Sequence, residues 1–398
     1  MVNRWIVLGF FCSAVLGYFG GTLALHYLPK LTSNSEALLQ LEGMRRPIIQ
    51  GYLPYWLIDK SATDYSSTLT DIAYFGLIVN GDGTIVTQTN PNETEPGWLA
   101  LSKDNLKTKL NNAEASGVNR SLLLQSGDEN AITKLITDPV AHAKVLMSQV
   151  EPIMDNHRFK DITIDIESSR QATESEQQQF TLFVKTLSML AHEHNRGNVY
   201  IDIPVYAYLK PTIYDPARLP STVDYVVLMA YDYHYRSSYV VGPVAPIDGG
   251  QVAWENDVDK AVKMALTTMK PEQLLLGVPL YGYEWETMTA TAGAPIIPAS
   301  GVTASNQRIN DLLQSCTNCT VDRNPLSQEL EIAYFDQTTQ SFHQIAIGDK
   351  QTMESKVALA KKYKLAGVAL WALGYEDSQL LSPLADYKDY RWILYSQH

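Results

Sequence analysis

The chain has 398 residues, of which 45% are hydrophobic and 19% charged, a composition typical of a globular protein and a length that suits one large barrel with insertions. Its formal net charge of −12 at pH 7 argues against nucleic acid or an anionic membrane surface as a partner, because an acidic surface attracts neither. A neutral substrate fits better, and the abundant tyrosines and tryptophans offer faces that can stack on sugar rings, although most aromatic residues of any protein lie in its core.

The N-terminal segment has the features of a membrane anchor. An almost uninterrupted apolar run extends from Trp5 to Leu28. It is long enough to span a bilayer and exceeds the apolar core of roughly 7–15 residues in a cleaved signal peptide. Because only Arg4 and the terminal amine precede it, we expect this tail to stay in the cytoplasm and the rest of the chain to lie outside. Cleavage near Ala24, which would give a secreted protein, is the alternative. The expected segments are a transmembrane signal-anchor at 1–30, a polar linker at 31–46 and one large domain at 47–398.

From residue 48 onward, strand-like apolar segments alternate with helical patterns. The predicted strands span 48–52, 71–79, 120–126, 159–167, 198–205, 225–231, 274–280 and 367–371. Helices with clear start signals lie between them, such as the capping box of Thr173 and Glu176. This alternation predicts an α/β fold of the (β/α)₈ TIM-barrel type, with a doubly wound open sheet as the competitor. No glycine-rich phosphate-binding motif follows any strand, so the sequence supports neither a nucleotide nor a nucleotide cofactor.

The fourth predicted strand carries an unusual row of polar residues. Asp161, Thr163, Asp165 and Glu167 alternate with isoleucines and therefore share one face. A parallel strand buried on both faces is normally a continuous apolar run, and buried carboxylates are costly unless they have a function. An edge strand with a solvated face is the alternative. Barrel enzymes place their chemistry at the C-terminal ends of the strands, where Glu167, Tyr231, Asp232, Tyr281 and Trp371 fall.

Residues 286 to about 346 break the alternation of strands and helices. This segment predicts a small α+β insertion between strands seven and eight. It contains Cys316 and Cys319, a spacing that would suggest redox or metal chemistry in the cytosol. No second cysteine pair completes a zinc site, and outside the membrane a small structural disulfide is the simpler interpretation. We also expect no metal at His192 and His194, because residues two apart on a helix do not face the same way.

Several of these segments together resemble glycoside hydrolase family 18, the chitinase-like barrels, over residues 48–380. The segment Met229-Ala230-Tyr231-Asp232 matches the family's Met-x-Tyr-Asp on strand six. The segments that begin at Leu276 and Gly367 resemble its strands seven and eight, and the insertion between them is also a family feature. The sequence of strand eight is most similar to that of the bacterial cell-wall and spore-associated branch of the family.

The fourth strand departs from the family pattern Asp-Gly-x-Asp-x-Asp-x-Glu. Asp165 and Glu167 match its last two acids, but Lys160 and Asp161 stand at its first two positions and Thr163 at its central aspartate. A carboxylate at Thr163 would help Asp165 hold or release a proton. A hydroxyl can hydrogen-bond to Asp165 but cannot share its charge, so we expect slower turnover or a shifted pH optimum.

The resemblance implies a hydrolase of β-1,4 linkages in N-acetylglucosamine-containing glycans, either chitin oligomers or peptidoglycan. The apolar N-terminal run adds the expectation that this hydrolase is membrane-anchored and extracytoplasmic. The resemblance also implies substrate-assisted retaining catalysis without a cofactor, in which the substrate's acetamido oxygen is the nucleophile. Glu167 would be the general acid and Asp165 would orient the acetamido group. Tyr231 would hydrogen-bond to the acetamido oxygen, and Asp232 would contact the sugar or Glu167.

The remaining residues expected at the substrate are Trp371 beneath the scissile sugar, together with Thr163, Met229, Tyr52, Trp56, Tyr281 and Trp285. Core packing is the alternative for the aromatic residues. The alternative function is a non-catalytic, lectin-like barrel of the same family. Degenerate relatives of that kind typically lose the acid, so the presence of Glu167 favours an enzyme.

Overall fold

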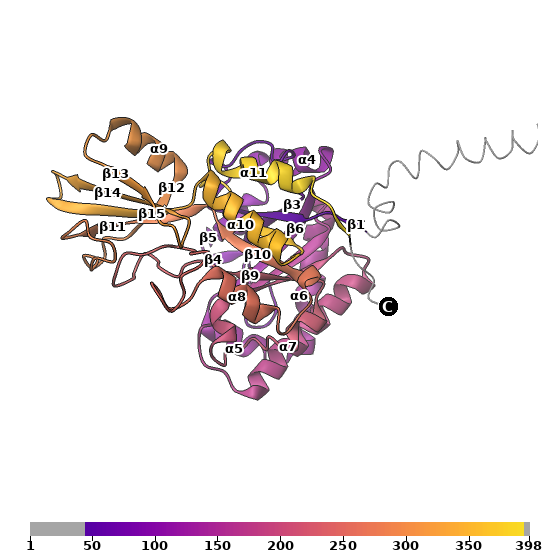
Figure 1. Cartoon of the computed structure of the whole chain (residues 1–398). Coiled ribbons are helices and arrows are strands. Elements are labelled where there is room, and N and C mark those ends of the chain that lie inside the picture. The colour runs from indigo at the N-terminus through magenta and orange to yellow at the C-terminus, as the bar shows by residue number, and fades with distance from the viewer. Residues whose placement is uncertain (1–43, 394–398) are drawn as a thin grey trace, which may run out of the picture. The chain divides into compact units, whose positions relative to one another are not determined.

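The computed structural model describes residues 44–393 (Figure 1). One compact unit runs from Pro47 to Lys388. A second unit contains β1 (Met44–Arg45) and β17 (Trp392–Ile393), which pair antiparallel. The predicted anchor at 1–30 and most of the predicted linker at 31–46 lie outside the described residues. Within residues 44–393, no helix combines the length and the apolar character needed to cross a membrane.

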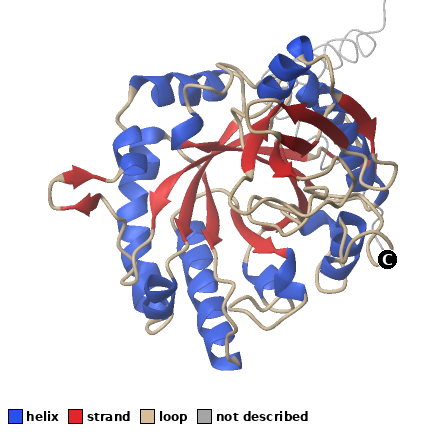
Figure 2. Ribbon diagram, turned by 90° about the vertical axis from the view of Figure 1, so that its left-hand side faces the viewer, coloured by secondary structure: helices blue, strands red, loops and turns tan. Residues whose placement is uncertain are grey.

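Eight parallel strands close into a barrel, which Figure 2 shows ringed by helices. In barrel order they are β2 (Ile48–Pro54), β3 (Asp71–Ile78), β6 (Asn119–Ser126), β7 (Asp161–Ile166), β8 (Val199–Pro204), β9 (Tyr225–Met229), β10 (Leu274–Pro279) and β16 (Gly367–Trp371), and β16 pairs back with β2. This confirms the predicted barrel and excludes the open sheet. The carboxylate strand is β7, which is paired on both sides and fully buried, so it is not an edge strand.

The helices around the barrel begin where polar side chains cap them. Thr173 and Glu176 form the predicted reciprocal cap of α7, and Asp138 caps α6. Asp257 caps α8 (Val258–Ala265) by accepting a hydrogen bond from the Lys260 amide. The α-helices are α3 (Pro96–Ala100), α4 (Asp104–Ala115), α5 (Glu129–Leu135), α6 (Pro139–His157), α7 (Glu174–Glu193), α8 (Val258–Ala265), α10 (Lys350–Lys362) and α11 (Ser378–Lys388), and the short 3₁₀ turns are η1 (Tyr55–Leu57), η2 (Val205–Tyr208), η3 (Leu219–Thr222) and η4 (Pro271–Gln273).

The insertion is a five-stranded antiparallel sheet, which projects from one side of the barrel in Figure 1. Its strands are β11 (Tyr281–Thr287), β12 (Val302–Ser305), β13 (Thr320–Arg323), β14 (Leu330–Asp336) and β15 (Ser341–Ile347), and α9 (Asn306–Ser315) follows β12. The sheet begins at residue 281 rather than the expected 286, since only Leu280 separates β10 from β11. A disulfide joins Cys316 to Cys319 after α9, and a separate hairpin of β4 (Gln88–Asn90) and β5 (Glu93–Thr94) follows β3.

One face of the insertion turns toward the barrel mouth. Tyr281, Tyr283 and Trp285 alternate along β11 and therefore share this face, where they pack with Val244 and approach Trp371. The opposite face packs against α9 through a separate apolar cluster. The insertion thereby adds tyrosine side chains to the open end of the barrel.

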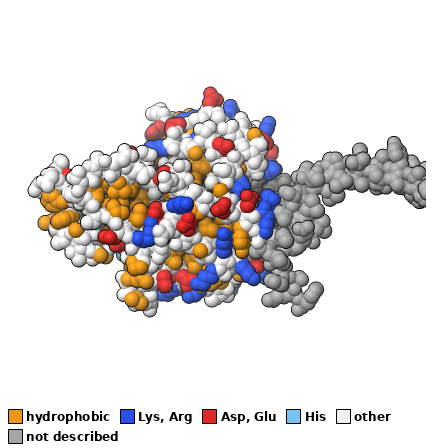
Figure 3. Space-filling model, turned by 45° about the horizontal axis from the view of Figure 1, so that its top comes forward, with side chains coloured by type: hydrophobic (Ala, Val, Ile, Leu, Met, Phe, Trp, Pro, Cys, Tyr) orange, Lys and Arg blue, Asp and Glu red, His pale blue; other side chains and the backbone are white. Residues whose placement is uncertain are grey.

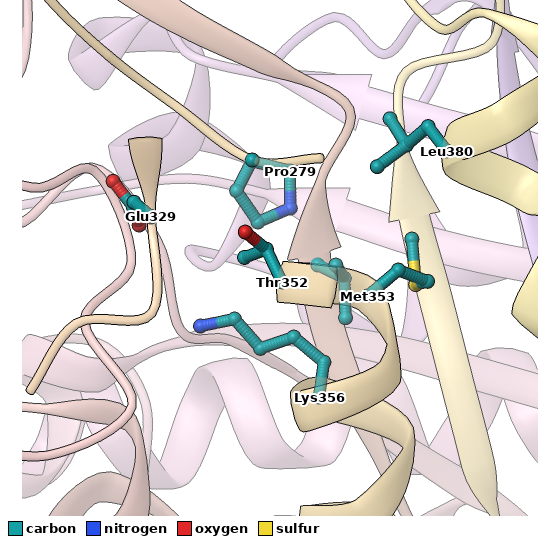
Figure 4. A pocket seen from close by; sticks show the side chains of 8 residues that line it. Pro279, Glu329, Thr352, Met353, Lys356 and Leu380 are labelled. Atoms are coloured by element: carbon teal, nitrogen blue, oxygen red, sulfur yellow. The ribbon is translucent and has the colours of Figure 1, made fainter. Parts of the chain in front are cut away.

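A buried ionic site ties the insertion to the barrel (Figure 4). Glu329, just before β14, accepts hydrogen bonds from the amides of Val244 (2.8 Å) and Ala245 (2.6 Å) in the segment after β9. Lys356 of α10 donates to the Ala245 carbonyl, and Glu329 and Lys356 are each only 1% exposed. Both line a small cavity with Pro279 and Thr352 (Figure 4). The segment after β9, the residue before β14 and helix α10 are distant in sequence, and they therefore meet at the opposite charges of Glu329 and Lys356.

Candidate active site

The polar face of β7 points into the barrel. The side-chain amide nitrogen of Gln50, on β2, donates to the hydroxyl of Thr163, on β7, at 3.4 Å. In the barrel order, β3 and β6 lie between these two strands. Thr163 and Asp165 are buried, whereas Glu167 lies one residue past the strand end and is exposed at the barrel mouth. The backbone amide of Glu167 still donates to the Ser126 carbonyl at 2.8 Å, so the backbone hydrogen bonds between β6 and β7 fix the position of Glu167.

Asp161 lies at the other end of β7, away from the mouth. Its carboxylate accepts from the Asn198 amide at 2.9 Å and from the Asn119 side chain. Burial, followed by the like charge of Asp71, raises the pKa of Asp161 to about 7. These contacts close the bottom of the barrel and do not reach Glu167 directly.

Thr163 does not hydrogen-bond to Asp165. Its hydroxyl bonds to the Ser121 hydroxyl at 2.8 Å and to Gln50, and these side chains form a polar layer inside the barrel. Among the described residues, no hydrogen bond joins Thr163 to Asp165, and the Asp165 Oδ1 atom is buried without a partner. The suggested hydrogen bond between the two side chains is therefore absent, because nearer polar groups occupy the hydroxyl. Thr163 is also fully buried, so it does not line the mouth where a sugar would lie.

Asp202 of β8 is a buried acid that the sequence reasoning missed. It is 3% exposed, and its Oδ1 atom accepts from the Tyr52 hydroxyl at 2.7 Å. The signal was present in the sequence, since Ile201-Asp202-Ile203 repeats the Ile-Asp-Ile pattern of β7. Tyr52, which was expected to line the cleft, is 3% exposed and instead holds this carboxylate.

The carboxylate of Asp232 is held by the insertion. The hydroxyls of Tyr281 and Tyr283 donate to its Oδ1 atom at 2.6 and 3.1 Å. Tyr281 is 4% exposed, so it positions Asp232 and presents little surface to a sugar. Tyr283 was not predicted, although its period-two spacing from Tyr281 indicates the same face. Tyr231 immediately precedes Asp232 and is half-buried.

The acids of the site have raised pKa values, mainly because the site is desolvated. Burial raises the pKa of Glu167, and the negative charge of Asp232 raises it further. Although the Glu167 side chain can reach solvent, the surrounding protein removes enough water to favour its neutral form. Burial also raises the pKa of Asp165, and the charges of Glu167 and Asp202 add to this shift. Glu167 is therefore suited to hold a proton near neutral pH, as a general acid requires.

Aromatic side chains gather beside these acids. Trp371 at the end of β16 is half-buried and packs edge-on against Phe75 at 4.9 Å and Trp56 at 6.4 Å between ring centroids. Trp56 is 46% exposed, and Met229 is half-buried at the end of β9. Trp285, by contrast, is fully buried in the insertion and donates to the Tyr235 carbonyl at 3.1 Å, so it has the core role that was the alternative to a place in the cleft.

Chemically, the mouth combines a protonatable acid, a second buried acid and a tyrosine hydroxyl beside exposed aromatic faces. These groups can protonate a leaving oxygen and bind a sugar. In the part of the chain that the structure describes, no three His, Cys, Asp or Glu side chains are grouped to hold a metal ion.

Known glycosylases and chitinases are similar to this chain in sequence or in fold. The chain is 24% identical to the cortical fragment-lytic enzyme of Bacillus subtilis, over 83% of this chain and 70% of that enzyme. It is 23% identical to the putative sporulation-specific glycosylase YdhD of the same organism, over 90% of this chain and 73% of YdhD. Its fold is similar to that of the Ostrinia furnacalis Group IV chitinase, with a TM-score of 0.72 and 18% identity over 86% and 99% of the two chains.

The sequence profile of glycosyl hydrolases family 18 matches residues 48–376, which include the whole barrel and the insertion. The chain therefore belongs to glycosyl hydrolases family 18 and is a glycosidase.

Proposed function

We propose that this protein hydrolyses β-1,4 linkages next to N-acetylglucosamine, in chitin oligomers or peptidoglycan, by substrate-assisted retaining catalysis. The observation that carries the proposal is the pairing of buried Asp165 with Glu167 at the barrel mouth, beside Tyr231 and Asp232. The substrate class is supported by the relatives, which include a cortical fragment-lytic enzyme and a chitinase.

Glu167 acts first as the general acid. It gives its proton to the oxygen of the glycosidic bond as that bond breaks. Its raised pKa keeps the proton available, because burial and the Asp232 charge both favour the neutral carboxyl. After the aglycone leaves, the ionised Glu167 takes a proton from the water that opens the intermediate.

Asp165 and Tyr231 act on the 2-acetamido group. Side chains two residues apart on a strand lie about 6–7 Å apart, which leaves room for this group near Glu167. The acetamido oxygen attacks the anomeric carbon and forms an oxazolinium ion, whose positive charge Asp165 stabilises. The Tyr231 hydroxyl hydrogen-bonds to the acetamido oxygen and fixes its direction of attack. Trp371 supports the sugar ring from below.

Hydrolysis of a fluorogenic N-acetylglucosamine oligomer and of purified peptidoglycan by the full chain in detergent tests this proposal. Glu167→Gln removes the transferable proton and is expected to lower kcat by about 10²–10⁴-fold. Glu193→Gln, an exposed glutamate at the end of α7, is the matched control and should retain wild-type kcat. Binding of the oligomer without turnover by the wild type and by Glu167→Gln alike would contradict hydrolysis and identify the lectin-like alternative.

The retaining mechanism has its own readout. Proton NMR of the first product should show the β-anomer before mutarotation, because two displacements at the anomeric carbon restore its configuration. Initial release of the α-anomer would mean direct attack by water and would refute the role assigned to the acetamido group.

We also propose that residues 1–30 anchor the enzyme in a membrane with the barrel outside, or release it if the segment is cleaved. The support is the apolar run from Trp5 to Leu28, and the Cys316–Cys319 disulfide suits an oxidising compartment. The barrel would then lie at the cell surface or in the periplasm, so protease treatment of cells freed of any outer membrane should degrade the barrel of an anchored protein. A barrel that becomes sensitive only after the cytoplasmic membrane is lysed would contradict both forms.

A further inference from the structure

Asp202 is a buried acid for which packing offers no explanation. It lies on β8 between Ile201 and Ile203 and is only 3% exposed. A carboxylate in such a place destabilises the fold unless it is paired or carries out a function. The Tyr52 hydroxyl, at 2.7 Å, satisfies one of its oxygens but brings no positive charge.

The strand register sets Asp202 beside Asp165. β7 and β8 are parallel neighbours in which Ile162 pairs with Val199 and Ile164 with Ile201. One further step along both strands brings Asp165 level with Asp202. Neighbouring strands lie about 4.8 Å apart, and both residues point to the barrel interior, so their carboxyl groups are adjacent. The Asp165 Oδ1 atom is buried without a hydrogen-bond partner, so this carboxyl group has an oxygen available to a shared proton.

We propose that Asp202 is a positioning residue that shares a proton with Asp165, and that it supplies from β8 the carboxylate that β7 lacks at Thr163. The proposal rests on the function proposed above and adds to it a residue outside the carboxylate strand. It also replaces the expectation that Thr163 leaves Asp165 without a partner acid.

The electrostatic surroundings favour one shared proton. The titratable groups facing Asp202 are Tyr52 from β2, Asp165 from β7, Glu167 just past the end of β7, and Tyr231 just past the end of β9. Two adjacent carboxylates in a dry site cannot both ionise at neutral pH. Burial and the neighbouring acids accordingly raise the pKa values of both Asp165 and Asp202.

Tyr52 decides where the proton lies. Its hydroxyl donates to Asp202, which stabilises the ionised form and lowers the pKa of Asp202 against the effect of burial. The shared proton therefore stays on Asp165. A protonated Asp165 can donate a hydrogen bond to Glu167 or the acetamido group as the substrate enters. The single negative charge that Asp165 and Asp202 share then stabilises the positive intermediate beside Asp165.

The test compares kcat, KM and the pH profile of the full-length wild type, Asp202→Asn and the double variant Asp202→Asn/Thr163→Asp. Asparagine keeps the shape of the side chain and removes its charge. We expect kcat to fall about 10–100-fold with little change in KM. Because the Asp202 charge raises the pKa of Asp165, its removal should move the basic limb of the kcat/KM profile to lower pH. The double variant, with a carboxylate restored beneath Asp165, should recover part of both losses.

A purely structural Asp202 predicts a different result. Asp202→Asn would then lose activity in proportion to its folded fraction, with an unchanged pH profile and no rescue by Thr163→Asp, and this outcome would overturn the proposal. Wild-type-like kcat and pH dependence in Asp202→Asn would overturn it as well.

Carbon-13 NMR titration of aspartate carboxyls keeps this test separate from the proposed function. If the wild type hydrolyses no glycan, the proposed function fails, yet the shared proton remains measurable. Asp165 should titrate above its ordinary range in the wild type and lower in Asp202→Asn. Identical titration of Asp165 in both proteins would overturn the proposal whatever their activities.

Discussion

At the scale of single residues, the acid strength of Glu167 depends on a carboxylate that is itself controlled by two tyrosines. The charge of Asp232 raises the pKa of Glu167. Burial raises the pKa of Asp232 itself, and the hydrogen bonds from Tyr281 and Tyr283 oppose that rise and favour its ionised form. Removing one donor should therefore act on Glu167 through Asp232.

Tyr281→Phe tests this connection. Loss of the 2.6 Å hydrogen bond raises the pKa of Asp232, so its charge is lost over part of the working range. The pKa of Glu167 then falls, and the basic limb of the kcat profile should move to lower pH, with a loss of roughly 10-fold at neutral pH. Tyr375→Phe, which removes a hydroxyl from a ring that packs against Tyr281 at 5.9 Å, is the control. Equal pH profiles for the two variants would contradict the connection.

The raised pKa of Asp161 predicts that the stability of the protein, rather than its catalysis, depends on pH. Its pKa is about 7 in the folded protein and 3.8 in an unfolded chain. The folded protein therefore binds more protons between these values, and the contribution to stability is complete below pH 3.8 and lost as the pH rises through 7. The unfolding free energy of the wild type relative to Asp161→Asn should fall by up to roughly 4 kcal/mol from pH 4 to pH 8 in urea titrations. A constant difference would show that Asp161 titrates normally.

Individual residues also show what could be predicted from sequence. Glu167, Tyr231, Asp232 and Trp371 lie at or just past the ends of barrel strands, and strand ends in a parallel barrel converge, so the sequence was sufficient to expect them at one end of the barrel. Their catalytic and binding roles stay predictions. Asp202 was missed because its importance comes from the β7–β8 register, which a single strand does not reveal. Tyr52 and Tyr281 were identified but given the wrong partner, because a strand pattern does not show whether a ring meets solvent or a carboxylate.

At the scale of secondary structure elements, strand β11 links the insertion to the proposed active site. It carries both tyrosines that hold Asp232, and it begins immediately after β10. The insertion was expected to begin at residue 286, where the alternation of strands and helices breaks, so the first residues of β11 fell outside the expected insertion. The position of the whole insertion should therefore matter for the active site, and the buried ionic site of Glu329 and Lys356 helps to fix that position.

Lys356→Met is expected to destabilise the protein by about 3–5 kcal/mol, because it leaves the buried carboxylate of Glu329 without its compensating charge. Lys356→Met/Glu329→Gln should recover part of that loss, since no buried charge remains. Lys350→Met, an exposed lysine of the same helix, is the control. Urea unfolding measures all three free energies. A single variant as stable as the control would show that the ionic site does not secure the insertion.

At the scale of the whole molecule, the protein carries a net negative charge. In Figure 3, acidic and basic side chains are interspersed over the barrel, while hydrophobic side chains gather on the protruding insertion. The formal charge of −12 gives no attraction to a neutral glycan, so aromatic contacts such as those of Trp371 and Trp56 should supply the binding energy.

The dependence of KM on salt concentration tests whether aromatic contacts supply the binding energy. The KM for a neutral N-acetylglucosamine oligomer should change less than about two-fold between roughly 0.05 and 0.5 M NaCl, because no net charge on the ligand is screened. A steep rise of KM with salt would show that charged groups, not aromatic faces, control binding.

The most direct measurement of the central claim is a crystal structure of Glu167→Gln with bound N-acetylglucosamine tetramer. The account predicts the glycosidic oxygen beside the residue-167 side chain, with one acetamido group within hydrogen-bond distance of Asp165 and Tyr231. The same sugar should lie on Trp371. An oligomer bound away from β7, or one whose acetamido group points away from Asp165, would contradict substrate-assisted hydrolysis at this site.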